Sequence, residues 1–230
     1  MTVRKSILII LLPFIIGCRP NQETSSTSTD MPTESQFIFD GHEYQIKNAQ
    51  IVAAIGDPYW CDTYNNGNGK SISWSISFDT TSDNDDLSPP NVDFDGININ
   101  VKNWHDLVGY KTKWSDSINS ETDDRYGMTY VYDHQLISNG SVQISARRGA
   151  DFQIIASGQN EEGQRFTINA PAEFKGIYVH GSENDTDESI RKRVKQQIDD
   201  SNLTGSPFKL EHKYGSGVKM GQSFYNPKTD

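Results

Sequence analysis

The sequence lacks the short motifs by which several common enzyme classes are recognised. It contains no HExxH pair, GxSxG elbow, GxxxxGK[ST] loop or GxGxxG loop. Zinc-hydrolase, serine-hydrolase and nucleotide-binding chemistry therefore have no local support. Cysteine is scarce as well, with only two in 230 residues, which excludes a disulfide framework. The sequence predicts no catalytic residue, no metal ligand and no cofactor.

Basic residues are in the minority, with 21 Lys and Arg against 31 Asp and Glu. Removing an N-terminal leader would take away Arg4 and Lys5 and no acidic residue, leaving 19 minus 31, or −12. Because nucleic-acid binding depends on positive charge, we expect no nucleic-acid partner. The 10 Tyr, 10 Phe and 4 Trp provide apolar side chains for a folded core.

Long hydrophobic runs are absent apart from one near the N-terminus. Residues 7–16 are apolar, follow Arg4 and Lys5, and precede Gly17 and Cys18. A helix of about ten residues spans roughly 15 Å, which is too short for a membrane core of about 30 Å. This arrangement is typical of a secretory signal peptide.

The four residues Ile15, Ile16, Gly17 and Cys18 resemble the lipobox of bacterial lipoproteins. The resemblance covers only this segment and implies cleavage before Cys18, a diacylglycerol on its sulfur and usually an acyl chain on the new amino terminus. Such an anchor holds a protein on a membrane. An ordinary signal peptide with an incidental cysteine, or a hydrophobic start that is not exported, is the alternative.

The residue after the cysteine bears on sorting in an envelope with two membranes. Aspartate at that place commonly favours retention in the inner membrane, and here it is Arg19. We therefore expect an outer-membrane lipoprotein facing the periplasm. In a cell with one membrane, the same anchor implies the outer face of the cytoplasmic membrane.

The chain divides into four predicted parts. A signal peptide at 1–17 precedes a lipidated tether at 18–36, which is rich in Ser and Thr and has few apolar residues. Residues 37–214 form a single β-rich domain, and 215–230 form a flexible tail.

Alternation of apolar and polar residues is the main signal in the domain. Residues 71–78 read SISWSISF, the pattern of a half-buried strand. Turn signals predict three hairpins, at Asp40-Gly41, Asp95-Gly96 and Asn139-Gly140. Further strands are predicted at 50–55, 128–133, 152–157, 165–169 and 174–180. This pattern indicates a mainly β fold, an antiparallel β-sandwich or barrel-like domain.

One surface helix is predicted near residues 186–200. Asp185 and Glu188 resemble a capping box, and an apolar stripe follows at Ile190, Val194 and Ile198. We expect the stripe to pack on the sheet. The basic residues between its members are expected to be solvated, with a partner-docking face as the alternative: Arg191, Lys192, Arg193 and Lys195.

Other candidate residues have a simpler structural interpretation. Cys61 follows two aromatic residues and has no nearby histidine to activate it. The segments FDTTSDNDD and VDFDGIN are rich in carboxylates but lack the order of a calcium loop, so solvated loops are favoured. The five histidines have no ligand spacing, and Trp104, His105 and Asp106 are merely adjacent. The aromatics are expected to form core, with sugar stacking as the alternative.

These features favour a lipid-anchored envelope protein that binds a protein partner and is not an enzyme. The partner would be a secreted toxin, for an inhibitor or immunity protein, or a subunit of an envelope complex. Acidic charge suits a basic partner. The alternatives are an envelope-directed hydrolase with a carboxylate pair and a carbohydrate-binding surface module.

Overall fold

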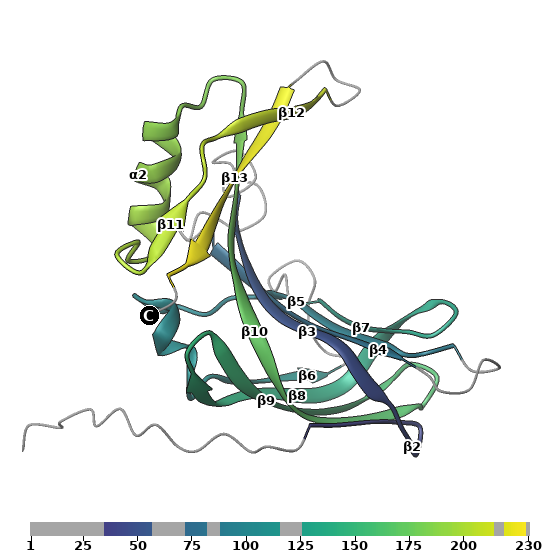
Figure 1. Ribbon diagram of the computed structural model, residues 1–230. Coiled ribbons are helices and arrows are strands. Elements are labelled where there is room, and N and C mark those ends of the chain that lie inside the picture. Colours follow the sequence, from purple (N-terminus) through teal and green to yellow (C-terminus); the bar gives the residue numbers. More distant parts are fainter. Residues whose placement is uncertain (1–34, 57–71, 82–87, 116–125, 214–218, 229–230) are drawn as a thin grey trace, which may run out of the picture.

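The computed structural model describes residues 35–56, 72–81, 88–115, 126–213 and 219–228 (Figure 1). Its strands are β1 (Gln36–Phe39), β2 (His42–Glu43), β3 (Gln45–Ile55), β4 (Ile72–Thr81), β5 (Asn91–Ile97), β6 (Lys111–Ser115), β7 (Tyr126–Tyr130), β8 (His134–Arg148), β9 (Asp151–Asn160), β10 (Arg165–Ser182), β11 (Leu203–Gly205), β12 (Lys209–Lys213) and β13 (Lys219–Pro227). The helices in these ranges are the 3-10 helix η1 (Trp104–Leu107) and α2 (Asp187–Gln197). The mainly β fold with one α-helix agrees with the sequence prediction.

Seven strands close into a barrel in the order β3-β4-β5-β7-β8-β9-β10. Neighbouring strands are antiparallel except β10 and β3, which are parallel. A closed ring with an odd number of strands cannot alternate in direction throughout, so one parallel pair is required. β6 pairs with β8 beyond the end of β7, and β1 pairs with the first part of β10.

The barrel interior is filled by apolar side chains from alternating positions. In β4, Ile72, Trp74, Ile76 and Phe78 are buried, while the serines between them are only half-buried. Similar buried apolar positions come from β3, β5, β8, β9 and β10, whereas β7 contributes the buried Thr129. Burial of such side chains contributes about 1.5–3 kcal/mol each, which makes this core the main source of stability.

The predicted hairpin at Asp40-Gly41 is confirmed. Both residues have positive φ, 47° and 82°, and they connect β1 with β2. Positive φ at both central positions is what a type I′ turn requires.

The other two hairpin predictions are wrong, because the glycines serve within strands. Gly96 lies in β5 with φ 66°, where β5 carries an extra residue relative to β4 and forms a bulge. Gly140 lies in β8, opposite Gly158 of β9. A Cβ at Gly140 would lie 2.8 Å from the Ser157 carbonyl oxygen, so this glycine permits close strand approach.

β10 links the barrel to a smaller extension. Its first half pairs with β9 and its second half with β3 and β13, so the two strands predicted at 165–169 and 174–180 are one strand. β13 pairs in turn with β11 and β12 (Figure 1). The prediction of a flexible tail over 215–230 is therefore wrong for Lys219–Pro227. This segment forms β13 because its backbone pairs with β10.

Helix α2 packs against the extension, as the stripe predicted. Ile190, Val194 and Ile198 are 0–3% exposed. The N-cap is Thr186, whose side chain accepts from the Ser189 backbone N–H while Ser189 Oγ accepts from Thr186, so the capping box lies one residue later than predicted. No helix in the described ranges is long and apolar enough to cross a membrane.

Candidate functional site

The outer surface of the barrel gathers acidic, aromatic and aliphatic side chains over β4, β5, β7 and β8. Val92 and Phe94 of β5 are fully buried, so Asp93 and Asp95 between and beyond them face outward. We define the acidic sheet face by these outward residues: Asp79, Asp93, Asp95, Met128, Tyr130, His134 and Leu136.

Strand register places the members of this face in rows. In one row Ser77 lies opposite Asp93, and Asp93 lies opposite Met128. Met128 in turn lies opposite Leu136. In the next row, Tyr130 lies between Asn91 and His134. Opposing residues in neighbouring strands have Cβ atoms about 5 Å apart, so carboxylates and apolar side chains form one continuous surface.

Asp93 is the electrostatic centre of the acidic sheet face. Burial and, to a smaller extent, the negative charges of Asp95 and Asp79 together raise its pKa to about 6, while His134 acts in the opposite direction. Desolvation disfavours an isolated carboxylate, and like charges add to that cost. Negative charge is therefore concentrated here without full compensation.

Asp79 belongs to the carboxylate-rich segment that was weighed as a calcium loop. Its Oδ2 accepts a hydrogen bond from Asn48 Nδ2 at 3.2 Å. Asp83, Asp85 and Asp86 lie outside the described residues. Within the described ranges, no group of three His, Cys, Asp or Glu side chains could hold a metal ion.

Exposed hydrophobic side chains border the carboxylates. Tyr132 is 71% exposed at the turn between β7 and β8, and Tyr130 and Leu136 are exposed on the flanking strands. The ring centroids of Tyr130 and His134 are 4.9 Å apart. The hairpin is anchored because Ser88 Oγ donates to the Val131 carbonyl at 2.8 Å and the Glu161 N–H donates to the Leu136 carbonyl at 3.0 Å.

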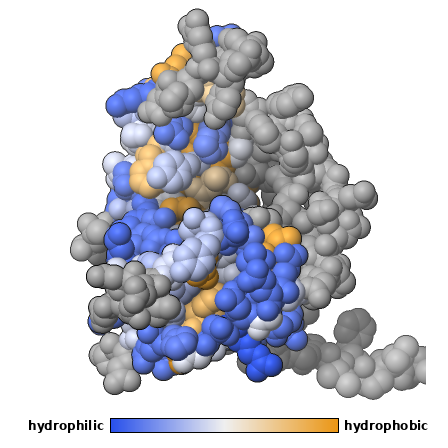
Figure 2. Space-filling view, turned by 90° about the vertical axis from the view of Figure 1, so that its right-hand side faces the viewer, coloured by the Kyte–Doolittle hydropathy of each residue, from blue (hydrophilic) through white to orange (hydrophobic). Residues whose placement is uncertain are grey.

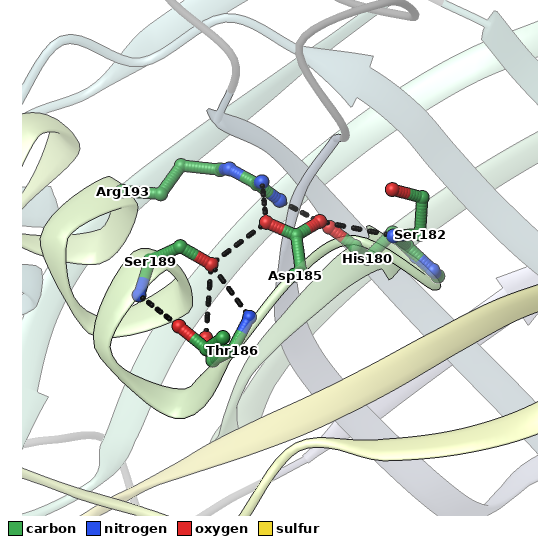
Figure 3. A network of polar contacts seen from close by, with 6 residues as sticks. All are labelled: His180, Ser182, Asp185, Thr186, Ser189 and Arg193. Atoms are coloured by element: carbon green, nitrogen blue, oxygen red, sulfur yellow. Dashed lines mark hydrogen bonds and ion pairs between the residues drawn. The ribbon is translucent and has the colours of Figure 1, made fainter.

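A second polar cluster, at the start of α2, contains Ser, His and Asp but is not a catalytic triad (Figure 3). Asp185 accepts from Ser189 Oγ at 2.8 Å, from Arg193 Nη2 at 2.8 Å and from the Ser182 N–H at 2.9 Å. His180 contributes only its backbone carbonyl, which accepts from Arg193. A triad needs the imidazole between the hydroxyl and the carboxylate, so the cluster is structural.

The charge of Asp185 is stabilised by these donors. Burial alone would raise its pKa, but the hydrogen bonds from Ser182, Ser189 and Arg193 outweigh burial and hold the pKa below its usual value. The Asp185–Arg193 pair is nearly buried, with side chains 12% and 11% exposed. The prediction that all four basic residues of the helix are solvated is wrong for Arg193, because the His180 carbonyl of β10 and the Asp185 carboxylate in the turn after β10 both accept hydrogen bonds from it.

Other residues considered in the sequence fall in the core or outside the described ranges. Trp74 is fully buried, and Trp104 is 2% exposed and stacks on Phe174 at 5.0 Å, which confirms their role as core. His105 and Asp106 lie with Trp104 in η1. The lipid-attachment residue Cys18 and the lone Cys61 lie outside the described residues.

Sequence reasoning missed the acidic sheet face, although the signal was present. Residues 92–95 read VDFD, an alternation that places Asp93 and Asp95 on one side of a strand. The Asp95-Gly96 pair predicts a turn and the VDFDGIN segment a solvated loop, and both predictions are wrong because residues 91–97 form β5. His134 and Leu136 share this face with Asp93 only because β7 lies between β5 and β8. That strand order could not be predicted from the sequence.

The view in Figure 2 shows one face of the molecule, mostly hydrophilic where it is coloured. Hydrophobic residues appear on this face as small separate groups. Small separate apolar groups are ordinary on the surface of a folded domain, so this view by itself marks no binding site.

Comparison with known proteins gives no family, since no protein-family model, curated protein or solved structure matches the chain. Function has to be inferred from the chain's own residues.

Proposed function

We propose that the protein is a lipid-anchored component of the bacterial cell envelope that binds a protein partner and catalyses no reaction. The proposed lipid anchor rests on the lipobox-like sequence of residues 15–18, which follows two basic residues and a short apolar run. Binding is supported by the acidic sheet face, where apolar side chains are exposed beside carboxylates.

The proposed location is the outer membrane, with the β domain facing the periplasm. Arg19 follows the lipidated cysteine, and the 17 mostly polar residues 19–35 separate Cys18 from β1. A flexible tether of this length has a root-mean-square span of roughly 25 Å, enough to hold the domain beside the headgroups. The partner would be a secreted toxin or a subunit of an envelope complex.

Replacing the lipidated cysteine tests the anchor. The variant Cys18→Ser is expected to accumulate as an uncleaved precursor or to leave the membrane fraction, because no thiol is available for diacylglycerol. Membrane fractionation and intact-mass measurement report both outcomes. Cys61→Ser is the matched control and should keep the wild-type mass shift and fractionation. Unchanged processing and fractionation of Cys18→Ser would refute the anchor.

Affinity capture from solubilised native envelopes tests the partner. The full lipoprotein, tagged after Asp230, is expected to retain one protein in stoichiometric amount through washes at moderate salt. Mass spectrometry identifies that protein. If several independent preparations retain nothing above the untagged control, a small ligand or polysaccharide becomes the better proposal.

A hydrolase is a second candidate, favoured by one observation. Asp93, with a pKa raised to about 6, is acted on by the charges of Asp79 and Asp95, and a carboxyl group that keeps a protonated fraction at mildly acidic pH can act as a general acid. Incubation of purified protein with envelope glycans and lipids separates the candidates. Product formation that disappears in Asp93→Asn would favour the hydrolase.

A further inference from the structure

We propose that the acidic sheet face is the docking surface for a basic protein that presents arginine side chains around an apolar side chain. The inference rests on the proposed function as a partner-binding protein and names the surface and the chemistry of the partner. Three observations carry it: the clustering of exposed apolar residues, the uncompensated carboxylates beside them and their common sheet face.

Exposed large hydrophobic residues are concentrated at one hairpin. Seven such residues are found across the described chain, and Tyr130, Tyr132 and Leu136 are three of them. They lie within seven consecutive positions of the β7–β8 hairpin, so their exposure is clustered. Tyrosine is enriched among the residues that dominate binding energy, because its ring buries area and its hydroxyl keeps a polar contact.

The carboxylates beside this hairpin have no basic partner in the part of the chain that the structure describes. The ion pairs found there join Lys175 with Glu173 and Arg193 with Asp185. The charges of Asp79 and Asp95 instead act on Asp93, and His134 of β8, which is separated from β5 by β7, partly opposes them. An arriving cation would relieve this repulsion, which makes charge complementarity the property that selects the partner.

The carboxylates and aromatic rings of the acidic sheet face favour arginine over lysine in the partner. A guanidinium can form paired hydrogen bonds to a carboxylate and can also stack on an aromatic ring. Asp93 and Tyr130 lie in adjacent rows of the sheet, so one planar group, or two neighbouring ones, can contact both. The aliphatic Met128 and Leu136 lie opposite each other in the Asp93 row and offer a place for an apolar side chain.

A defined peptide tests this chemistry on the full lipoprotein in detergent micelles. The probe is a synthetic peptide of alternating arginine and leucine, and its dissociation constant is measured by calorimetry at pH 7.5. The double variant Asp93→Asn/Asp95→Asn is expected to weaken binding at least tenfold. The control Glu183→Gln/Glu188→Gln removes the same charge from exposed positions in the first turn of α2 and the turn before it and should change binding less than twofold.

A second pair of variants tests whether exposed aliphatic side chains of the acidic sheet face contribute to binding. Leu136→Ala is expected to weaken binding of the same peptide about fivefold, whereas Ile155→Ala, which removes an equally exposed aliphatic side chain from β9, should leave it unchanged. Equal losses in both charge variants, or in both aliphatic variants, would overturn the assignment of this face. Thermal unfolding of each variant confirms that the domain remains folded.

Capture from native envelopes then separates the two proposals. Wild-type protein that retains a partner, together with an Asp93→Asn/Asp95→Asn variant that loses it, supports the acidic sheet face. Retention of the partner by both proteins overturns this inference and leaves the proposed function intact. Failure of the wild type to retain any partner overturns the proposed function itself.

Discussion

The barrel and the extension are built from one continuous sheet but are stabilised in different ways. The barrel surrounds a core in which Trp74, Phe94 and Phe174 are fully buried, and its strands close on themselves through backbone pairing. The extension rests on the stripe of one helix and on the hydrogen bonds that converge on Asp185. Apolar burial therefore dominates in the barrel, while the helix of the extension is held by a narrow apolar stripe together with a polar network at its N-terminus.

β10 shows how one strand serves both regions. Gly176 has φ 136°, and a Cβ there would lie 2.3 Å from the Tyr225 carbonyl oxygen. The register with β3 shifts at the same place. Glycine thus allows β10 to change direction and to bring β13 close as the strand leaves the barrel.

The largest expected effect is loss of the barrel core. Trp74→Ala removes a fully buried ring that packs 5.8 Å from Phe174 and donates from Nε1 to the Ile99 carbonyl at 3.3 Å. We expect the free energy of unfolding to fall by about 4 kcal/mol. Denaturant titration measures this loss, with Tyr132→Ala as an exposed control. A loss confined to one region, with the other intact, would show that barrel and extension unfold independently.

A smaller and more local effect is expected in the extension. Asp185→Ala removes the acceptor of three hydrogen bonds and leaves Arg193 without its carboxylate. We expect a loss of about 2 kcal/mol, with faster hydrogen exchange in α2 and unchanged exchange in β4 and β5. The wild-type contribution is present above pH 4 and is lost as the pH falls through the lowered pKa of Asp185. Uniformly faster exchange across the barrel would contradict a local role.

The smallest expected effect is a gain on the outer face of the barrel. Asp93→Asn removes a carboxylate whose pKa is about 6 when folded and 3.8 as the reference value. Because the folded state holds this proton more tightly than the unfolded chain, the wild type gains stability as the pH falls from above 6 towards 4. After allowance for solvent screening, we expect Asp93→Asn to stabilise the domain by about 1 kcal/mol at pH 7.5.

Unfolding at several pH values checks this last prediction. The gain should shrink as the pH falls and should vanish below pH 4, where the wild-type carboxyl becomes protonated in the unfolded chain as well as in the folded state. If the stability gained by Asp93→Asn did not depend on pH, the gain would come from a change in packing and not from removal of the negative charge.

Local periodicity predicted the strands and the helix well. The alternation predicted for residues 71–78 appears over residues 72–78 as part of β4, and the stripe of Ile190, Val194 and Ile198 is buried as expected. The errors at Gly96 and Gly140 share a cause, because a glycine needed for a bulge or for close strand approach looks like a glycine needed for a turn. β13 was missed because its pattern is short and its pairing partner lies far along the chain.

The sequence by itself determined the mainly β class, the single amphipathic helix and the lipobox resemblance, since each depends on residues close together in the chain. Only the tertiary structure decided that seven strands close into a barrel and that Asp79, Asp93, His134 and Leu136 share one face. Strand order joins residues that are tens of positions apart. Local periodicity sets which side of a strand a residue faces, but not which strand lies beside it.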